Sequence, residues 1–338
     1  MKKFALKFLV LILAFLFLTT LAVKANEPEL EPFFLTGDAV MYIPRSLGLF
    51  ENPGDANYNA IISPQTVTVL DSRNGWFKIN TWVGPRWINF DFMPSPNEAN
   101  AFMRQFSNTS IFFYNIETGF TFTYNADRVF FGASISKASF ALYMYQRADR
   151  GEIDLNREIT LTWADWNAGS GVIQNLYRPG DNVTTRRLIE LSLYQSDNIA
   201  TLALRRVFGV EGYRQFIASL GANPHRVGDR IMNSHLTTNE VGIFARAIFN
   251  YIESDYPNSA DFKAALLNNQ FPFQVSDYEK ASKTGWTTPS AWHDMSIIYA
   301  NSPYILVIMS AREGWRAQDY NDFANISRFF QEFNDRWF

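Results

Sequence analysis

The hydrophobic spacing of the chain changes from strand-like to helix-like and back, and this order restricts the possible folds. Short apolar runs between about residues 110 and 124 flank a turn at Glu117-Thr118-Gly119, as in a β-hairpin. From 134 to about 267 the spacing is mostly helical, and strand-like runs return after Lys280. An apolar stripe predicts a terminal helix: Phe323, Ile326, Phe330, Phe333 and Trp337. We therefore predict an α/β domain (an α+β sandwich), in which helices flank an antiparallel sheet and an all-helical lobe is inserted.

The first 25 residues have the pattern of an export signal. Three lysines at positions 2, 3 and 7 precede an apolar run from Phe8 to Leu18, and Val23-Lys24-Ala25 is a small-x-Ala step. We predict a signal peptide over residues 1–25, cleaved after Ala25; an uncleaved N-terminal anchor is the alternative. Both interpretations place the remainder outside the cytoplasm, as an extracellular or cell-envelope protein.

The segment 28–92 contains short apolar runs broken by glycine, proline and asparagine, which predicts a small all-β barrel. The run NGWFKINTWVGPRWI, with a tight turn at Asn74-Gly75, resembles bacterial SH3-like modules. The resemblance implies binding of a cell-wall polymer. In the alternative, Trp76, Trp82 and Trp87 only form the core of a spacer. Prolines in Met93-Pro94-Ser95-Pro96-Asn97 predict a linker over 93–105, followed by the larger domain at 106–338.

Composition narrows the chemistry that this chain can perform. It has no cysteine, which excludes thiol nucleophiles, disulfides and zinc-cysteine sites. Its three histidines, at positions 225, 235 and 293, are too few to suggest a multi-histidine metal site. The net charge of -3 gives no electrostatic argument for binding nucleic acid. We predict no metal and no cofactor, which leaves hydroxyl, carboxylate and lysine chemistry.

A Ser-x-x-Lys pattern, Ser134 to Lys137, opens an apolar helix. Residues three apart share a helix face, so the lysine can act as a base for the hydroxyl if burial or a nearby cation lowers its pKa. The alternative is that Ser134 only caps the helix and Lys137 is solvated. Two later patterns also have structural readings: Ser196-Asp197-Asn198 as a helix cap, and Lys283-Thr284-Gly285 as a strand end.

In this order, Ser-x-x-Lys, Ser-Asp-Asn and Lys-Thr-Gly are the signature set of penicillin-recognising serine enzymes. From about residue 110 to 338 the chain resembles the class A β-lactamase-like family, which also has counterparts of Gly169-Ser170-Gly171 and His293-Asp294. The resemblance implies that Ser134 is acylated, with Lys137 as its base or part of the proton relay. It also implies that Ser196 passes a proton to the leaving nitrogen.

Substrate-binding roles follow from the same resemblance. Asn198 would hydrogen-bond the side-chain amide of the substrate, and Lys283 and Thr284 would bind its carboxylate. Gly285 would let the substrate backbone lie against the strand. The oxyanion hole would consist of the backbone N–H groups of Ser134 and Trp286. His235 and His293 are read as hydrogen-bonded structural residues, not as bases.

One family feature is missing from the sequence. Class A β-lactamases release the acyl group with a glutamate that acts through a water molecule. The corresponding stretch, 221–242, contains only Glu240, which is predicted to lie inside the next helix, and no Glu-x-x-Leu-Asn. Asp229 precedes Asn233 by four and is the candidate replacement; its alternative is a solvated turn residue beside Gly228.

Three functions therefore remain open. The first is a β-lactamase that hydrolyses β-lactam amide bonds. The second is a D,D-peptidase or slow-turnover penicillin-binding protein that acts on the peptidoglycan stem peptide. The third is a non-catalytic sensor or scaffold, bound to the cell wall through residues 28–92. The sequence does not fix the oligomeric state, and we expect a monomer.

Overall fold

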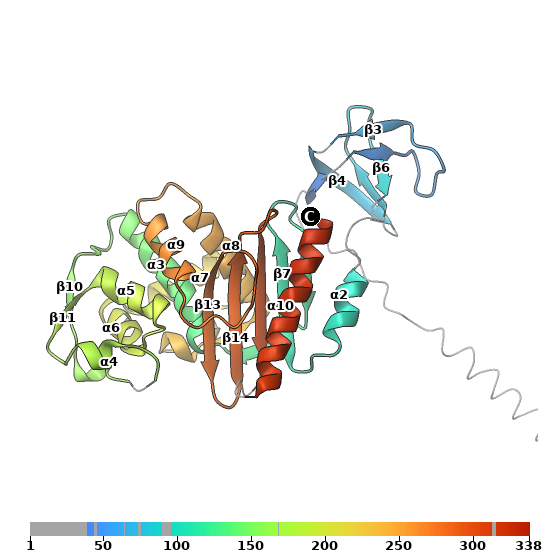
Figure 1. The fold of residues 1–338 in the computed structure, drawn as a ribbon. Helices are drawn as coiled ribbons and strands as arrows, with labels where there is room; N and C mark the ends of the chain where they lie inside the picture. The colour runs from blue at the N-terminus through green and yellow to red at the C-terminus, as the bar shows by residue number, and fades with distance from the viewer. Residues whose placement is uncertain are drawn as a thin grey trace, which may run out of the picture.

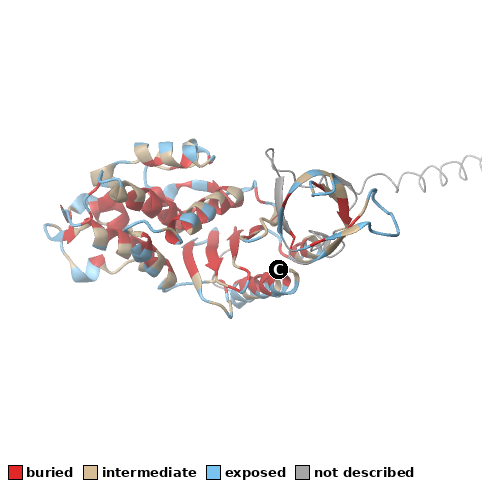
Figure 2. Ribbon diagram, turned by 90° about the horizontal axis from the view of Figure 1, so that it is seen from above, coloured by how far each residue is buried: buried red, intermediate tan, exposed pale blue. Residues whose placement is uncertain are grey.

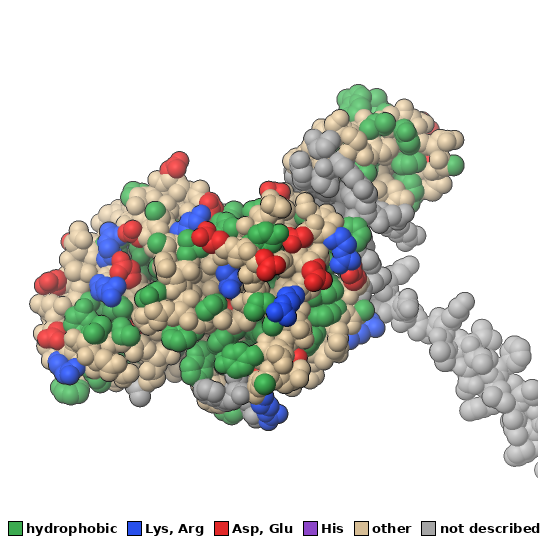
Figure 3. Space-filling model, in the orientation of Figure 1, with side chains coloured by type: hydrophobic (Ala, Val, Ile, Leu, Met, Phe, Trp, Pro, Cys, Tyr) green, Lys and Arg blue, Asp and Glu red, His purple; other side chains and the backbone are tan. Residues whose placement is uncertain are grey.

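The structure is a computed structural model, and it describes residues 39–43, 46–63, 65–73, 76–89, 96–167, 169–312 and 316–338. The predicted signal peptide (1–25) and the predicted turn at Asn74-Gly75 lie outside these residues. Within the described ranges, no helix has both the length and the hydrophobicity that a bilayer crossing requires. Acidic and basic side chains are interspersed on the face shown in Figure 3, in keeping with the net charge of -3.

The N-terminal part is a small all-β unit (blue in Figure 1). Its antiparallel sheet has the order β1 (Ala39–Ile43), β4 (Gln65–Arg73), β5 (Trp76–Ile79) and β6 (Arg86–Asn89), and β2 (Leu47–Leu49) pairs with β3 (Ala60–Ile62). Phe50 and Trp87 exchange two backbone hydrogen bonds of 2.8 Å, which join the two ladders. Aliphatic side chains form the core: Ile43, Leu49, Ile62, Val67, Ile79 and Ile88.

The three tryptophans of this unit do not share one environment. Trp87 is buried with 5% of its surface exposed, Trp76 is half-buried, and Trp82 is 65% exposed. The interpretation of all three as core residues is therefore wrong for Trp82. The SH3-like identity of the unit stays a prediction.

The predicted linker over 93–105 is largely a helix. Residues 96–103 form α2 (Pro96–Met103), and Met103 and Ala99 are fully buried against the last helix of the chain together with Phe106. The prolines suggested an extended path, but proline is tolerated in the first turn of a helix, where its missing N–H has no intrahelical partner. The larger domain therefore begins at least as early as α2.

A five-stranded antiparallel sheet forms the centre of the larger domain. Its order is β13 (Lys280–Thr287), β14 (Ala291–Ile298), β15 (Tyr304–Ser310), β7 (Thr109–Asn115) and β8 (Thr121–Tyr124). Two strands come from the start of the domain and three from its end, as the sequence predicts. This arrangement brings distant segments of the chain into direct pairing, since β7 lies beside β15 and Thr109 pairs with Ser310.

Both faces of this sheet are covered. Along β15, Leu306 and Ile308 pack in the cluster with α2 and α10 (Ala317–Trp337), whereas Ile305 and Val307 pack in the cluster of the helical lobe. Figures 1 and 2 show α10 along one side of the sheet and the helices of the inserted segment opposite it. The predicted stripe of α10 is confirmed, because Phe323, Ile326, Phe330 and Phe333 are at most 1% exposed.

The inserted segment is mainly helical, with short strand pairs. Its α-helices are α3 (Ser136–Asp149), α4 (Ile173–Leu176), α5 (Thr185–Tyr194), α6 (Asn198–Phe208), α7 (Glu211–Ser219), α8 (Thr238–Ile252) and α9 (Ser259–Leu267). Its short strands are β9 (Val129–Phe131), paired with β12 (His235–Thr237), and β10 (Glu158–Thr160), paired with β11 (Asn182–Thr184). Its 3₁₀ turns are η2 (Ala133–Ile135), η3 (Trp163–Asp165), η4 (Pro224–Arg226) and η5 (Ile231–Asn233).

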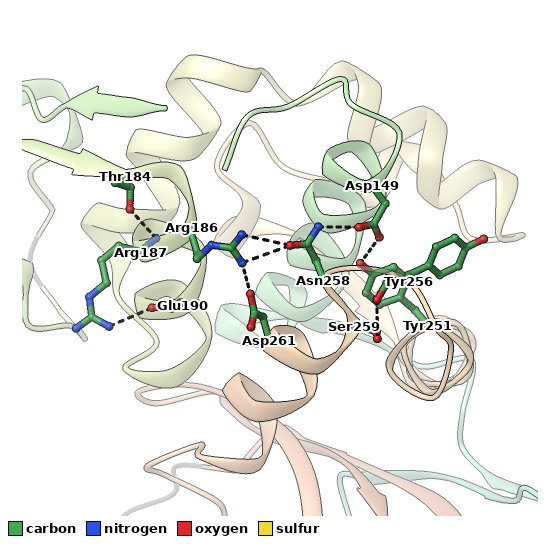
Figure 4. A network of polar contacts seen from close by, with 10 residues as sticks. All are labelled: Asp149, Thr184, Arg186, Arg187, Glu190, Tyr251, Tyr256, Asn258, Ser259 and Asp261. Carbon is green, nitrogen blue, oxygen red and sulfur yellow. Dashed lines mark hydrogen bonds and ion pairs between the residues drawn. The ribbon is translucent and has the colours of Figure 1, made fainter. Parts of the chain in front are cut away.

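A polar network ties four of these helices together (Figure 4). The guanidinium of Arg186 on α5 pairs with Asp261 on α9 and donates to Asn258. Asn258 donates in turn to Asp149 at the end of α3, at 2.6 Å, and Asp149 also accepts from Tyr251 on α8. The network fixes α5 and α3, and both helices lead directly to the residues of the candidate site.

Candidate active site

The Ser-x-x-Lys serine lies in a tight turn, not in a regular α-helix. Ser134 is the middle residue of η2, directly before α3, and the preceding Ala133 has a φ of 46°. A left-handed conformation is unfavourable for alanine, and such strain is common at functional sites. Two hydrogen bonds hold the turn: the N–H of Gly132 donates to the carbonyl of Ser234 at 2.7 Å, and Ser136 Oγ donates to the carbonyl of Ile231 at 2.7 Å.

Lys137 is fully buried in the first turn of α3 and points at the Ser-Asp-Asn segment. Its Nζ donates to the Ser196 carbonyl at 2.6 Å, to Asn198 Oδ1 at 2.8 Å and to Ser196 Oγ at 3.4 Å. Burial lowers its pKa well below the ordinary value, the charge of Lys283 adds to this, and Asp197 opposes it. The alternative of a solvated lysine is therefore wrong. Among the described residues, the hydroxyl of Ser134 has no hydrogen-bond partner, so Lys137 does not bond to it directly.

A second lysine, Lys283, also bonds to the Ser196 hydroxyl, and it does so from the sheet. Lys283 on β13 is fully buried, and its Nζ donates to Ser196 Oγ at 3.0 Å and to the Thr284 carbonyl at 2.8 Å. Burial lowers its pKa to about 7, although Asp294 acts in the opposite direction. The Ser196 hydroxyl therefore lies between two amines whose pKa values are lowered. This arrangement can move protons near neutral pH.

Asp197 holds the loop that faces Ser196. Its Oδ2 accepts the N–H groups of Val172 and Ile173 at 2.7 and 2.8 Å, and its Oδ1 accepts the N–H of Ala200 at 3.0 Å. A β-carbon on Gly171 would lie 2.2 Å from Oδ2, and the φ of Gly171 is 128°. Only glycine fits there. The cap predicted for Asp197 thus also holds Val172, which lines the same cleft as Ser134.

Gly285 serves to bring the sheet close to the serine turn. A β-carbon at Gly285 would lie 2.5 Å from the backbone N of Ile135 and 2.7 Å from the carbonyl oxygen of Gly132. The serine turn therefore occupies the space beside this glycine, and the approach of a substrate backbone to the strand stays a prediction. The function of Gly285 is to place β13, with Lys283 and Trp286, against η2.

The buried side chains of His293 and Asp294 on β14 form hydrogen bonds to the backbone of neighbouring segments. The N–H of Ser310 donates to His293 Nδ1 at 3.1 Å, so Nε2–H donates to the Phe131 carbonyl at 2.9 Å. Burial lowers the pKa of His293 to about 4, which keeps it neutral. Burial also raises the pKa of Asp294 to about 7; it accepts the backbone N–H groups of residues 273 and 274 at 2.7 and 2.8 Å. His293 is thus a structural residue, as expected, whereas His235 is exposed.

A cleft of about 660 Å³ opens above these groups. Three predicted site residues line it: Ser134, Asn198 and Trp286. Four others lie beneath its surface and are at most 6% exposed: Lys137, Ser196, Lys283 and Thr284. The structure therefore brings together residues from η2, α3, α6 and β13 around one cleft.

The candidate deacylation residue does not join them. The side chain of Asp229 is 84% exposed, pairs with Arg214 at 3.1 Å, and is not among the described residues that line the cleft. Glu240 is buried in the first turn of α8 and bonds to Arg226 at 2.9 Å and to the N–H of Thr237 at 2.8 Å. Among the described lining residues, none carries a carboxylate.

Several lining residues were not anticipated from the sequence. They include Asn167, Gln195, Arg230, Asn233 and Phe271. Arg230 and Asn233 belong to the same short stretch as Asp229. The spacing that singled out the aspartate therefore pointed to a segment that lines the cleft, although Asp229 itself is not among the described lining residues. Phe271 belongs to no sequence motif. Its segment is held near the cleft by hydrogen bonds from the backbone N–H groups of residues 273 and 274 to Asp294.

Comparisons with known proteins identify the family and the fold of this chain. A sequence model described as the "Beta-lactamase enzyme family" matches residues 96–332. Beta-lactamase ROB-1 of Haemophilus influenzae is 33% identical over 126 residues, which is 37% of this chain and 40% of that protein. The chain thus matches less than half the length of this curated relative.

Solved structures share the fold at lower identity. PBP-A has a TM-score of 0.64 and 16% identity, covering 71% of this chain and 96% of that one. A β-lactamase from Sphaerobacter thermophilus has a TM-score of 0.59 and 23% identity, covering 68% and 94%. Because the family model matches well over half of the residues, this chain belongs to the beta-lactamase enzyme family.

Proposed function

We propose that the protein is a serine hydrolase of the penicillin-binding type, which is acylated on Ser134 and releases the acyl group slowly. In this proposal Lys137 takes the proton of Ser134, directly or through a water molecule, while the hydroxyl forms a bond to the carbonyl carbon. Ser196, between the two lysines, gives a proton to the leaving nitrogen. The N–H groups of Ser134 and Trp286 stabilise the oxyanion, and both residues line the same cleft.

The absence of a carboxylate among the described lining residues supports slow release. Hydrolysis of the acyl-enzyme needs a base that activates water at the ester, and Asp229 and Glu240 are both engaged elsewhere. A D-alanyl stem peptide fits such a site, since its acyl group can pass to an amine or slowly to water. PBP-A, whose fold is similar, has been solved as a penicillin G acyl-enzyme in an L158E variant. ROB-1, the curated relative, is described as a β-lactamase, which favours β-lactam recognition.

A chromogenic cephalosporin tests this proposal. We expect a burst of about one equivalent of opened lactam per protein, followed by turnover that is slow compared with the burst. Intact-mass analysis should show a single adduct that decays over the same period. Continuous turnover without a burst or an accumulated adduct would instead identify an efficient β-lactamase, and no burst and no adduct would exclude acylation.

The acylation rate is also expected to depend on the charge of Lys283. Its pKa of about 7 in the free protein means that the ammonium loses its proton as the pH rises through 7. Attraction for the substrate carboxylate is then lost, so the second-order acylation rate constant should fall above pH 7. The fall approaches about ten-fold per pH unit at most. The measurement is the pH profile of adduct formation with penicillin.

Lys283→Arg is the matched variant for this profile. Arginine remains protonated throughout the range, so its profile should lack the decrease above pH 7 even if its maximal rate is lower. Circular dichroism would check that the larger side chain leaves the fold intact. The same decrease in wild type and variant would show that another group titrates.

We further propose that the protein works outside the cytoplasm and that residues 28–92 localise it to the cell wall. The export pattern of residues 1–25 supports the first part. The exposed indole of Trp82, at 65%, supports the second, because tryptophan on a surface commonly contributes to binding. Pull-down of the protein with purified cell walls, compared with a Trp82→Ala variant, tests the localising role separately from acylation.

A further inference from the structure

One charged side chain stands out in the cleft. Arg230 is exposed, and it is the single charged residue among the described residues that line the cleft. No described carboxylate forms an ion pair with it; the nearby Asp229 pairs with Arg214 instead. An unpaired guanidinium at the wall of a cavity without carboxylates is available to an anionic group of a ligand.

The backbone around Arg230 holds this arrangement in place. The N–H of Asn233 donates to the Arg230 carbonyl at 2.8 Å, which closes the turn. At Gly228, a β-carbon would lie 2.6 Å from the carbonyl oxygen of Asn233, so the two ends of the turn are in close contact. The two consecutive side chains of this turn have different surroundings. Asp229 is exposed to solvent, whereas Arg230 lines the cleft.

The rest of the cleft adds to the preference for anions. Lys137 and Lys283 lie beneath its floor, and the other lining residues are neutral. Lys283 is on β13 and is assigned to the carboxylate next to the scissile bond, whereas Arg230 is on the turn that precedes η5. A ligand that satisfies both cations carries two separate anionic groups.

We infer that Arg230 selects substrates whose acyl side chain carries a carboxylate, so that the natural substrate is a peptide with an acidic group on the acyl side of the bond that is broken. This inference rests on the proposed acyl-enzyme function and specifies its substrate class. Arg230 is a specificity-determining residue in this account and takes no part in the bond-breaking step.

Three penicillins that differ at one carbon test the inference. Carbenicillin carries a carboxylate on the side chain of benzylpenicillin, and ampicillin carries an ammonium at the same position. We expect wild-type protein to be acylated about five-fold faster by carbenicillin than by benzylpenicillin, and more slowly by ampicillin. The preference should weaken as salt is added, because an exposed charge pair is screened.

Substitutions separate charge from shape. Arg230→Gln should bring the ratio of carbenicillin to benzylpenicillin rates close to one. Arg230→Lys should keep most of the ratio, which also guards against a folding defect in the glutamine variant. Arg328→Gln, at an exposed position of α10 outside the cleft, is the matched control and should change neither rate.

The outcomes distinguish the two levels of the proposal. Equal rates for the three penicillins, or an anion preference that persists in Arg230→Gln, would overturn the role of Arg230 while the acyl-enzyme function stands. The absence of an adduct with every penicillin would overturn the proposed function itself. A ratio that is lost in Arg230→Gln and kept in Arg230→Lys and Arg328→Gln supports the inference.

Discussion

Replacing Ser134 with alanine is expected to abolish covalent labelling of the protein by penicillin. In the proposed mechanism Ser134 Oγ forms the bond to the substrate carbonyl, and alanine offers no nucleophile at that position. Ser134 is half-buried and lines the cleft, so the loss of one oxygen should leave the fold unchanged. Intact-mass analysis after incubation with penicillin should show one adduct in the wild type and none in the variant.

The matched control for this experiment is Ser219→Ala. Ser219 is exposed at the end of α7, and its hydroxyl donates only to the Phe216 carbonyl of its own helix, at 2.6 Å. This variant should be labelled at the wild-type rate. Labelling of Ser134→Ala at an unchanged rate would assign the reaction to another residue and remove the basis of the proposed function.

Replacing Lys137 with methionine is expected to slow acylation by roughly 10²- to 10⁴-fold, the range associated with loss of general-base catalysis. The methionine side chain has a similar length but no proton acceptor. The substitution also leaves the Ser196 carbonyl and Asn198 Oδ1 without the donor that bonds them at 2.6 and 2.8 Å. We therefore also expect a modest decrease in the free energy of unfolding, because buried acceptors lose a partner.

Two measurements keep these effects apart. The rate of adduct formation reports on catalysis, and thermal unfolding followed by circular dichroism reports on stability. Lys263→Met is the control, since the ammonium of Lys263 forms a surface ion pair with Glu253 at 2.8 Å, and such pairs contribute little. If Lys137→Met acylates as fast as Lys263→Met, the base is a different group.

The sequence was sufficient for the layout of the larger domain. Alternation between strand and helix periodicity predicted a sheet made from both ends of the domain, and the stripe on α10 predicted the helix that covers one face. Helix α2 was missed because Pro94 and Pro96 in the sequence favoured an extended path. Only the burial of Ala99 and Met103 shows that tertiary packing overrides that local preference.

The geometry of the cleft was harder to predict than its residue types. Motif spacing pointed to Lys137, Ser196 and Lys283. The structure places the Nζ atoms of both lysines within 3.4 Å of Ser196 Oγ. The left-handed backbone at Ala133 and Ser196, with φ of 46° and 53°, has no sequence signal, because neither residue favours that conformation. Surrounding contacts impose it.

The turn before η5 is a second place where the sequence did not predict the geometry. A spacing of four residues before Asn233 drew attention to Asp229, but spacing does not tell which side chain of a tight turn enters a cleft. Arg214 on α7 forms an ion pair with Asp229 on the exposed side of the turn. The sequence pattern around Asp229 does not predict this pairing, because Arg214 lies 15 residues away. Slow release in our proposal follows from the lack of a carboxylate among the described residues that line the cleft.

Peptide mapping of the penicillin-treated protein tests the central claim most directly. Trypsin cuts after Arg128 and Lys137, so the peptide 129–137 contains both Ser134 and Ser136. We predict that fragment ions place the penicilloyl group on Ser134 and that most of the protein still carries it long after free penicillin is removed. A group located on Ser136 or outside this peptide, or one released within a single mixing time, would contradict the account.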